Sequence, residues 1–383
     1  MTPIGRDRLD RMALSLVAEP GDPRLPQLLA EHEPGRVLSA IRGGRTLPGF
    51  GIPEAWAERA HDVDTRLEEC RGRAASARLR WICPGDRGWP TQLDDLDHVD
   101  PLQASTGAPL GLWLRGSGDL AQLSERAVAI VGARNCTTYG AECASDLGAD
   151  LADDGWTVVS GAAYGIDGCA HRGALAMGKP TVAVLACGAD VDYPRSHASL
   201  LEHISHDGLV ISEQAPGQAP MKRRFLSRNR LIAALSLGTV VVEAALRSGS
   251  LNTLHRADQL GRVTMALPGP VTSQASGGVH AAVREGVAVL VTSGRDVIEE
   301  LGGLGAEEAA RPVAVTEFDR LPPSARATLD GLDWSGSRSL AEIAAWVRLS
   351  TREVRSALAL LERRDLVVRQ GAGWVLNRRA DVS

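Results

Sequence analysis

Short apolar runs between residues 78 and 302 constrain the fold of this chain more than any other feature. They are rich in Val, Ile and Ala, and segments of helix length separate them. Nearly continuous apolar runs are typical of parallel strands buried on both faces, and strands that alternate with helices form doubly wound sheets. The sequence therefore predicts an α/β fold with a Rossmann-like, doubly wound, mostly parallel sheet over 78–302. The predicted strands are Val128–Val131, Thr157–Ser160, Thr181–Leu185, Leu209–Ser212, Thr239–Val242, Val263–Ala266 and Ala288–Thr292.

Two further regions flank the predicted sheet. Residues 1–75 contain short helical segments separated by Gly- and Pro-rich turns, which predicts a small N-terminal helical module. Residues 303–315 are rich in Gly, Glu and Ala and are expected to form a linker. In 316–378, two segments with helix-turn-helix spacing precede two alternating segments around a Gly-Ala-Gly turn, which predicts a winged helix.

The net charge limits how this chain can contact nucleic acid. Its 383 residues carry a net charge of −5, whereas a general binder of polyanions is usually basic. Any such contact must therefore come from a local basic patch. The 6 cysteines have no CxxC spacing, which argues against a zinc site and a disulfide framework. We find no apolar run long enough for a membrane span and no secretory signal, so we expect no membrane partner and a cytoplasmic location.

The first candidate site follows the predicted strand Val128–Val131. There Gly132 precedes Arg134, and a helix is expected to begin soon afterwards. Ligands of open α/β sheets bind beyond the carboxyl ends of the strands. The glycine allows a phosphate to approach the backbone, and the guanidinium of Arg134 matches the geometry of a phosphate. The alternative is a strand-capping glycine beside a surface arginine, and without GxGxxG dinucleotide binding has little support.

Two further loops follow predicted strands at the same edge of the sheet. Ser160 and Gly161 begin a small-residue loop whose amides are expected to form a phosphate-binding nest. Arg195 lies in the second loop, after a Tyr-Pro pair, and is included among the expected phosphate contacts, although a plain turn is the alternative. His171 invites a catalytic interpretation, but no Ser, Cys or carboxylate arrangement frames it as a base, so a packing role is favoured.

The sharpest signal is the basic segment 222–230, which has five cations within nine residues at an expected helix start. Cations there oppose the helix dipole, so the arrangement favours an anion site over a structural role. Phe225 lies inside the segment, and a basic patch around an aromatic ring is typical of phosphate contacts combined with base stacking. The alternative is a solvated charged face with Phe225 in the core. The residues predicted to contact DNA here are Lys222, Phe225, Arg228, Asn229 and Arg230.

The last candidate segment follows the fifth predicted strand. Ser248 and Gly249 open the next helix-length segment and are included among the expected phosphate contacts. Glu243 stands at the strand end. We expect it to orient Arg228 or Arg230 by ion pairing, and the alternative is a catalytic carboxylate.

Together these blocks resemble the family of DNA-processing proteins known as DprA or Smf. The resemblance covers about 80–300 and rests on the order Gly-x-Arg, Ser-Gly…Gly-Ile-Asp…Ala-His, Tyr-Pro, Arg-Asn-Arg, Glu-Ala…Ser-Gly-Ser-Leu and Pro-Gly. It implies that Arg134 holds a phosphate, that Lys222 is a phosphate-binding lysine, and that Phe225 stacks on a base. The chain departs from the family pattern at several positions, and Tyr164 stands where an arginine is common.

The resemblance also implies a function and partners. Proteins of this family bind single-stranded DNA in a positively charged pocket, dimerise, and load the RecA recombinase during natural transformation. We therefore expect a binding protein without enzymatic activity, cofactor or metal, whose partners are single-stranded DNA, RecA and a second copy of the chain. The last predicted strand and its helix leave an exposed edge that self-pairing would cover. The residues predicted for the dimer interface are Val279, Ala282, Val283 and Val287.

Two other functions compete with this prediction. A nucleotide-binding or phosphoribohydrolase-like Rossmann enzyme would use Glu243 beside the segment 248–253, but a mononucleotide does not need the basic segment 222–230. A transcription regulator would use the winged helix as its DNA reader and the α/β domain as a ligand sensor. Its second predicted helix, Thr351–Arg363, carries acidic as well as basic residues, so sequence-specific reading is the less favoured hypothesis.

Overall fold

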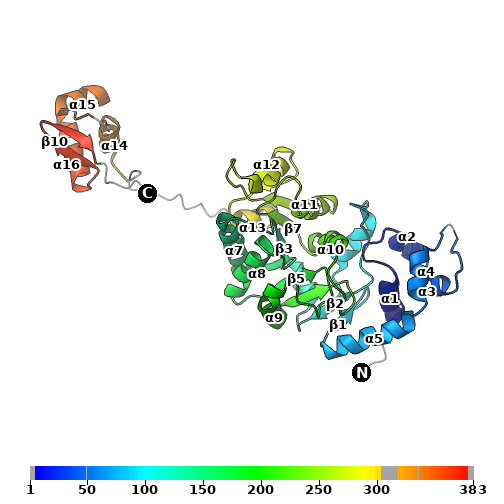
Figure 1. The fold of residues 1–383 in the computed structure, drawn as a ribbon. Helices are drawn as coiled ribbons and strands as arrows, with labels where there is room; N and C mark the ends of the chain where they lie inside the picture. Colours follow the sequence, from blue (N-terminus) through cyan, green and yellow to red (C-terminus); the bar gives the residue numbers. More distant parts are fainter. Residues whose placement is uncertain (1–4, 49, 303–317, 319, 334–335, 378–383) are drawn as a thin grey trace. The chain divides into compact units, whose positions relative to one another are not determined.

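Figure 1 shows the computed structural model, which describes residues 5–48, 50–302, 318, 320–333 and 336–377. The chain divides into two compact units, residues 1–306 and 307–383. The first unit contains the N-terminal helices and a large sheet, and the second contains helices and a hairpin. The predicted linker at 303–315 lies outside the described residues.

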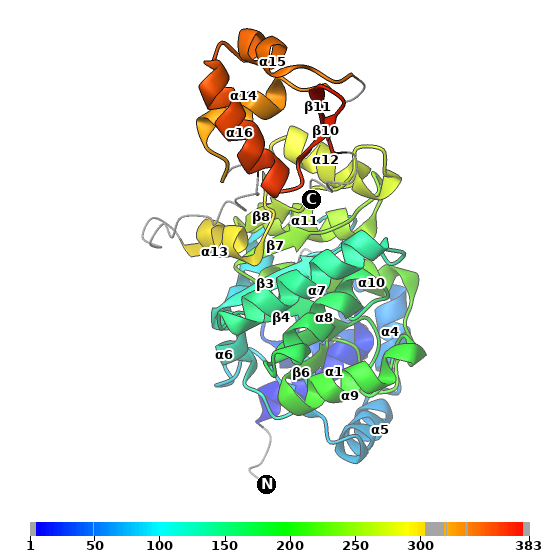
Figure 2. The same ribbon diagram turned by 90° about the vertical axis from the view of Figure 1, so that its left-hand side faces the viewer.

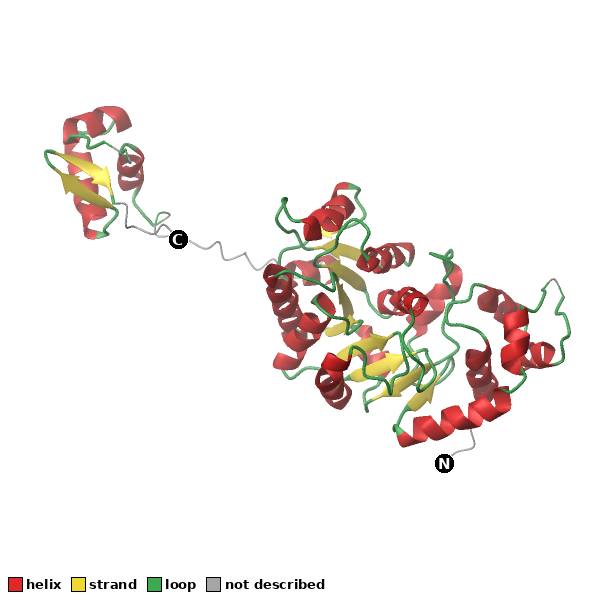
Figure 3. Ribbon diagram, in the orientation of Figure 1, coloured by secondary structure: helices red, strands yellow, loops and turns green. Residues whose placement is uncertain are grey.

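The large sheet has nine strands (Figure 3). They are β1 Arg80–Ile82, β2 Leu112–Arg115, β3 Ala127–Val131, β4 Thr157–Ser160, β5 Thr181–Leu185, β6 Leu209–Ser212, β7 Gly238–Val241, β8 Val263–Ala266 and β9 Val289–Leu290. Their order is β1-β2-β6-β5-β4-β3-β7-β8-β9. Strands β3 to β9 pair in parallel, whereas β1 and β2 add an antiparallel edge beside β6. The order reverses between β3 and β7, which makes this the switch point of the sheet.

The predicted parallel core is confirmed by the burial of the central strands. Every residue of β3 is buried, and the same holds for β4, β5, β6 and β7. Successive residues of β3 face opposite sides, so that Ala129 belongs to one apolar core and Ile130 to another. A strand covered on both faces has no solvent side, which is why its sequence is a continuous apolar run. The first unit therefore has the doubly wound α/β fold.

Helices cover both faces of this sheet (Figures 1 and 2). They are α6 Leu120–Glu125, α7 Thr138–Asp153, α8 Ile166–Ala176, α9 Ala198–Asp207, α10 Lys222–Ala234, α11 Gly249–Gln259, α12 Gly277–Arg284 and α13 Gly294–Gly302, with 3-10 turns η1 Thr91–His98, η2 Arg195–His197 and η3 Gln274–Ser276. Helices α10, α11 and α12 pack into one core, and α7, α8 and α13 into the other. Helices from both faces of the sheet therefore lie next to the loops around the switch point.

The N-terminal module packs on the antiparallel edge of the sheet. Its helices are α1 Arg6–Val17, α2 Arg24–Glu31, α3 Pro34–Arg42, α4 Glu54–Ala60 and α5 Val63–Ser76. Leu14 and Trp56 lie in a core that continues into Trp81 and Trp113, whose ring centroids are 4.8 Å apart. Arg8 of α1 donates a hydrogen bond to the carbonyl oxygen of Trp81 at 2.7 Å. The module and the sheet therefore share one apolar core.

The second unit is described by itself. It contains α14 Pro323–Asp330, α15 Leu340–Val347, α16 Thr351–Arg363, β10 Val367–Gln370 and β11 Gly373–Leu376. Helix α15 begins with a capping box formed by Ser339 and Glu342, and α16 begins with one formed by Ser350 and Glu353. The two helices and the antiparallel hairpin follow in the predicted order. The assignment of this unit as a winged helix stays a prediction.

Three strands at or next to the edges of the sheet differ from the sequence prediction. The apolar pattern does not predict β1 and β2, because they are short and lie outside the repeating strand-helix order. It predicts a strand over Ala288–Thr292, but β9 contains only Val289 and Leu290. The hydroxyl and amide of Thr292 both donate to the carboxylate of Asp296 at 2.7 Å, which turns the chain into α13.

Candidate nucleic-acid interface

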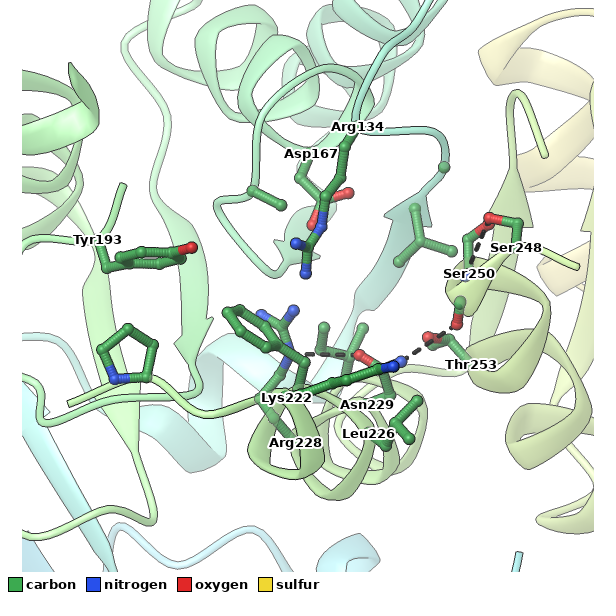
Figure 4. Close-up of a pocket in the computed structure, with 17 residues that line it drawn as sticks. Arg134, Asp167, Tyr193, Lys222, Leu226, Arg228, Asn229, Ser248, Ser250 and Thr253 are labelled. Atoms are coloured by element: carbon green, nitrogen blue, oxygen red, sulfur yellow. Dashed lines mark hydrogen bonds between the residues drawn. The ribbon is translucent and has the colours of Figure 1, made fainter. Parts of the chain in front are cut away.

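A cavity of about 720 Å³ lies at the switch point of the sheet (Figure 4). The loops that follow β3, β4, β5 and β7 surround it together with α10 and the start of α11. We call it the switch-point cavity. It lies at the carboxyl edge of the sheet, where open α/β folds bind ligands. The predicted site residues that line it are Gly132, Arg134, Lys222, Phe225, Arg228, Asn229, Ser248 and Gly249.

One wall of the cavity is a stack of a cation and two aromatic rings. The guanidinium carbon of Arg134 lies 4.5 Å from the ring centroid of Phe225. The rings of Phe225 and Tyr193 are 5.7 Å apart and tilted by 49°. Phe225 is half-buried and belongs to none of the apolar cores of the described residues. This placement favours the stacking role of Phe225 over the alternative of a core side chain.

The loop after β3 carries Arg134 into the cavity, as Figure 4 shows. A Cβ atom at Gly132 would lie 2.6 Å from Cγ1 of Ile166 and 3.0 Å from the carbonyl oxygen of Glu243. Only glycine leaves room for this close approach between the loop, α8 and the end of β7. Gly132 thus sets the path of the chain that presents the guanidinium of Arg134.

Helix α10 forms the floor of the cavity. Lys222 stands exposed at its first turn, and Arg228, which follows six residues later, is buried. The Nη1 atom of Arg228 donates to the carbonyl oxygens of Gly161 and Val184. The helix therefore supplies one exposed cation that can reach a ligand and one buried cation held by backbone oxygens.

A buried carboxyl group lies beside this buried cation. Burial raises the pKa of Asp167, while the charge of Arg228 and a hydrogen bond from the Gly161 amide act in the opposite direction. Burial lowers the pKa of Arg228 to about 10. Arg228 is therefore charged at neutral pH and adds positive potential beneath a bound ligand.

The opposite wall is the N-terminus of α11. The hydroxyl of Ser248 caps this helix, accepting from the amide of Ser250 at 3.3 Å. The side-chain amide of Asn229 donates to the carbonyl oxygen of Gly249 at 3.2 Å and accepts from Nε of Arg228 at 3.3 Å. Asn229 therefore ties α10 to α11. A helix N-terminus at this wall favours a negatively charged ligand.

The structure contradicts the predicted role of Glu243. Its carboxylate accepts from the hydroxyl of Thr137 at 2.6 Å and from the amide of Thr137 at 2.9 Å. Thr137 is the N-cap of α7, so Glu243 stabilises the start of that helix. No contact joins Glu243 to Arg228 or Arg230 in the part of the chain that the structure describes, and the orienting role is wrong.

Arg230 is a structural residue, which corrects its prediction as a DNA contact. Its guanidinium is 1% exposed and forms a two-pronged ion pair with Glu213, with both N–O distances 2.7 Å. Its Nε atom donates to the carbonyl oxygen of Gly107 at 3.0 Å. With its donors used inside the protein, Arg230 has none directed at the switch-point cavity.

Ser160 and the amide of Gly161 do not supply the phosphate contacts predicted for them. Ser160 is fully buried and its hydroxyl donates to the carbonyl oxygen of Ile130 at 2.6 Å. The amide of Gly161 donates to the carboxylate of Asp167 at 3.1 Å. Both groups are therefore satisfied within the fold. A Cβ at position 161 would collide with the guanidinium of Arg228, so the glycine makes room for that side chain.

The loop after β5 contributes a residue other than the predicted one. Arg195 is exposed in η2 and does not line the switch-point cavity, whereas Tyr193 does. Tyr193 could have been predicted from the sequence as a site residue, because it is one of only 3 tyrosines in the chain and follows a strand at the edge of the sheet that carries the site. His171 is fully buried, with Nδ1 at 2.8 Å from Oγ1 of Thr181, as a packing role requires.

The predicted dimer residues are only partly at the surface. Val279 is 1% exposed and Ala282 is 6% exposed, and both belong to the core beneath α12. Their prediction as interface residues is therefore wrong, because the helix turns its small apolar face inward. Val283 and Val287 are half-buried against the same core.

The residues that the structure describes contain neither a metal-binding cluster nor a membrane-spanning helix. Within them, no three His, Cys, Asp or Glu side chains gather where they could hold a metal ion. None of their helices has the length and hydropathy needed to cross a membrane.

The fold and the site define a Rossmann-like protein with a cationic, aromatic-walled cavity at the switch point of its sheet. The chain belongs to the family of DNA recombination-mediator protein A, whose family model matches residues 80–302. The resemblance to the DprA and Smf proteins is thereby confirmed. The match covers the sheet and the loops that form the cavity.

Individual relatives agree with this assignment. The chain is 39% identical over 378 residues to a DNA processing protein DprA of Mycobacterium tuberculosis, a match that covers 95% of this chain and 93% of the relative. It is 44% identical over 208 residues to DNA processing protein DprA of Streptococcus pneumoniae, covering 54% of this chain and 72% of the relative. The X-ray structure of the Streptococcus pneumoniae protein matches with a TM-score of 0.61 at 32% identity, covering 77% of this chain and 97% of that one.

Proposed function

We propose that the chain binds single-stranded DNA in the switch-point cavity without strong sequence preference. The observation that carries this proposal is the stack of Arg134, Phe225 and Tyr193 beside Lys222. Aromatic faces stack on bases of any sequence, and neighbouring cations neutralise phosphates. A duplex hides its base faces, so a wall of this kind favours unpaired strands.

Phosphate contacts are assigned to the exposed groups around the cavity. Arg134 and Lys222 are exposed and line it, and the N-terminus of α11 at Ser248 and Gly249 adds backbone amides. Arg228 contributes its charge from the floor. These contacts position a strand without reading its sequence.

The further role follows from the family. Membership among recombination mediators supports a protein that protects single strands and loads the RecA recombinase onto them, in DNA recombination and natural transformation. We assign the protein to the cytoplasm, where that DNA and the recombinase meet. We also propose a homodimer through β9, because Val289 and Leu290 are 47% and 49% exposed on the last strand of the sheet.

We propose that the chain performs no chemistry on its ligand. The enzyme hypothesis needs Glu243 as a free carboxylate, but Glu243 is 1% exposed, bonds to Thr137 and does not line the cavity. Incubation with nucleoside monophosphates tests this directly. Release of free base by the unmodified protein would contradict the proposal.

The main experiment is a binding titration with single-stranded and double-stranded oligonucleotides of mixed sequence at two salt concentrations. Affinity should favour single strands and fall steeply with salt, with a log–log slope of about −0.7 for each neutralised phosphate. Equal affinity for duplex, or affinity independent of salt, would refute single-strand binding through this cavity.

A further inference from the structure

A second hollow lies between the N-terminal module and the loop that follows β6. It consists of two cavities of about 440 and 170 Å³, which share Leu16, Arg66, Ala215 and Gln218 in their linings. Helices α1 and α5 form one side and residues 214–218 form the other. We call these two connected cavities the module groove.

The module groove is positively charged although the chain as a whole is negative. Its lining contains two carboxylates, Glu19 and Glu69, and a larger number of guanidinium groups. The arginines are Arg59, Arg66, Arg73 and Arg224. Local cationic excess in a chain of net charge −5 marks a surface that attracts anions. No aromatic side chain lines the groove, so it lacks the means to stack bases.

Two of these arginines line the groove with charge that is not fully neutralised. The side chain of Arg73 is exposed and makes no hydrogen bond or ion pair with any described residue. It lies over Gly217, where a Cβ atom would collide with its guanidinium. Arg66 donates to the carbonyl oxygens of Arg59 and Leu16 at 2.9 and 2.8 Å, which fix its orientation. These acceptors are uncharged, but Nη1 of Arg66 also lies 3.7 Å from Oδ1 of Asp62 at the start of the same helix. The charge of Arg66 is therefore partly neutralised, whereas the side chain of Arg73 is unpaired among the described residues.

The module groove is joined to the switch-point cavity by one segment of chain. Pro220 and Lys222 line the cavity, whereas Gln218 and Arg224 line the groove. Between them stands Arg223, whose side chain is 64% exposed. A strand that leaves the cavity past Lys222 therefore meets Arg223 before it reaches the groove.

A single carboxylate organises this junction. Glu19 of the N-terminal module pairs with Arg223 at 2.9 Å, with Arg224 at 3.4 Å and with Arg59 at 3.5 Å. One negative charge cannot neutralise three guanidinium groups, so the junction keeps a net positive charge. Glu19 holds the cations in place and leaves donors for phosphate oxygens.

We propose that the module groove binds the phosphodiester backbone of the same single strand whose bases occupy the switch-point cavity. The inference rests on the proposed function of that cavity and extends it onto the N-terminal module. Guanidinium groups match the geometry of phosphate oxygens, and without an aromatic side chain the groove offers no ring on which a base can stack. The module thereby lengthens the binding site and anchors the strand on one side of the cavity.

The test measures the affinity of oligothymidylates of increasing length for the full chain and for groove variants. The variants are Arg73→Ala and the double change Arg66→Ala with Arg73→Ala. Arg71→Ala is the matched control, because Arg71 lies on the same helix, pairs with Glu68 at 3.0 Å and does not line the groove. Melting curves identify any variant that fails to fold. If the double variant fails to fold, the single variant Arg73→Ala still tests the proposal, because Arg73 is exposed.

The expected result is a loss of affinity that appears only for the longer oligonucleotides. For these, the salt slope should decrease by about 0.7 for each lost phosphate contact, while the shortest oligonucleotide that binds should be unaffected. Arg71→Ala should match the unmodified protein at every length. If both groove variants bind oligonucleotides of every length as tightly as the unmodified protein does, the module groove does not bind the DNA backbone. An equal loss of affinity at all lengths would refute the proposal as well.

Two further outcomes distinguish a failure of the switch-point cavity from a different ligand in the module groove. If short oligonucleotides fail to bind the unmodified protein, or bind Lys222→Ala equally well, the proposed function of the cavity itself falls. If poly-L-glutamate binds the chain and loses affinity in Arg73→Ala while oligonucleotides of all lengths do not, the groove takes an acidic polypeptide, and its assignment to DNA is refuted.

Discussion

The guanidinium of Arg134 lies over the ring of Phe225, 4.5 Å from its centroid, in the wall of the switch-point cavity. The two residues come from different elements, the loop after β3 and the first turn of α10. A cation over an aromatic face is attracted by the ring and is held there in advance of the ligand. The pair therefore holds a guanidinium that can donate to phosphate oxygens beside an aromatic ring, in a fixed relation.

The stacking role of Phe225 is tested by Phe225→Ala. If a base stacks on the ring, the variant should lose about 1–3 kcal/mol of binding free energy for single-stranded oligonucleotides. The melting temperature should change little, because Phe225 lies outside the apolar cores. Titration and thermal unfolding are measured together. A fall in melting temperature with unchanged affinity would show that the ring is a packing residue.

The phosphate contacts are tested by Arg134→Ala and Lys222→Ala. Each variant should weaken binding to a similar extent for oligonucleotides of different sequence, since phosphate contacts carry no sequence information. Each should also reduce the salt slope by about 0.7 for single strands. Affinity is compared across several sequences and salt concentrations. A loss confined to one sequence would instead indicate base recognition.

The corrected role of Glu243 predicts an effect on stability. Glu243→Ala removes the acceptor for the hydroxyl and amide of Thr137, and hydrogen bonds to charged groups are worth about 1.5–3 kcal/mol. Denaturant unfolding should show a loss of this order, while Glu243→Gln should lose less. No nucleotide hydrolysis is expected in any of these proteins. Hydrolysis by the unmodified chain that disappears in Glu243→Gln would restore the enzyme hypothesis.

Burial of His171 predicts how stability depends on pH. Burial lowers the pKa of His171 from 6.5 to about 3. Below pH 6.5 the unfolded chain binds a proton that the folded chain does not, so this residue's contribution to stability is lost as the pH falls from about 6.5 towards 3. The free energy of unfolding is measured across this range, with His171→Gln as the comparison. Parallel pH profiles for the two proteins would contradict the depressed pKa.

The dimer proposal is tested at the exposed strand β9. Leu290→Glu places a charge on a side chain that is 49% exposed, so the fold should survive while self-association is lost. Light scattering should report monomers for the variant and dimers for the unmodified chain. Long oligonucleotides should bind the monomer less tightly, because two linked sites raise the effective concentration of the second. An unmodified chain that stays monomeric at high concentration would refute the dimer.

The central strands of the fold could be predicted because a strand that is buried on both faces is a continuous apolar run in the sequence. β4, β5, β6 and β8 have the bounds that the apolar runs predict, and β3 and β7 differ by single residues. β9 could not be predicted to its true length, because the apolar Ala288 and Val291 are buried in cores without belonging to the strand. An apolar run in the sequence indicates that residues are buried. Whether those residues belong to a strand depends on hydrogen bonding to a neighbouring strand, which the run does not reveal.

The site residues could be predicted only where the local sequence determines whether a side chain is exposed. Lys222 and Arg230 lie in the same basic segment, yet Lys222 is exposed and Arg230 is buried against Glu213. The partner of Arg230 comes from the end of β6, 17 residues earlier, and nothing in the spacing of the arginines reveals it. Likewise, Thr137 and Glu243 are 106 residues apart in sequence and meet only because β3 and β7 are neighbours.

The hydrogen bond from Arg8 to the carbonyl oxygen of Trp81 has a consequence for assembly. It occupies an acceptor of β1, on the strand that ends the sheet opposite β9. A sheet with two open edges can add copies of itself without limit, whereas a sheet with one open edge can pair only once. Arg8 of the helical module thus occupies one backbone acceptor that a further copy would need at β1. This limits the proposed association through β9 to two copies.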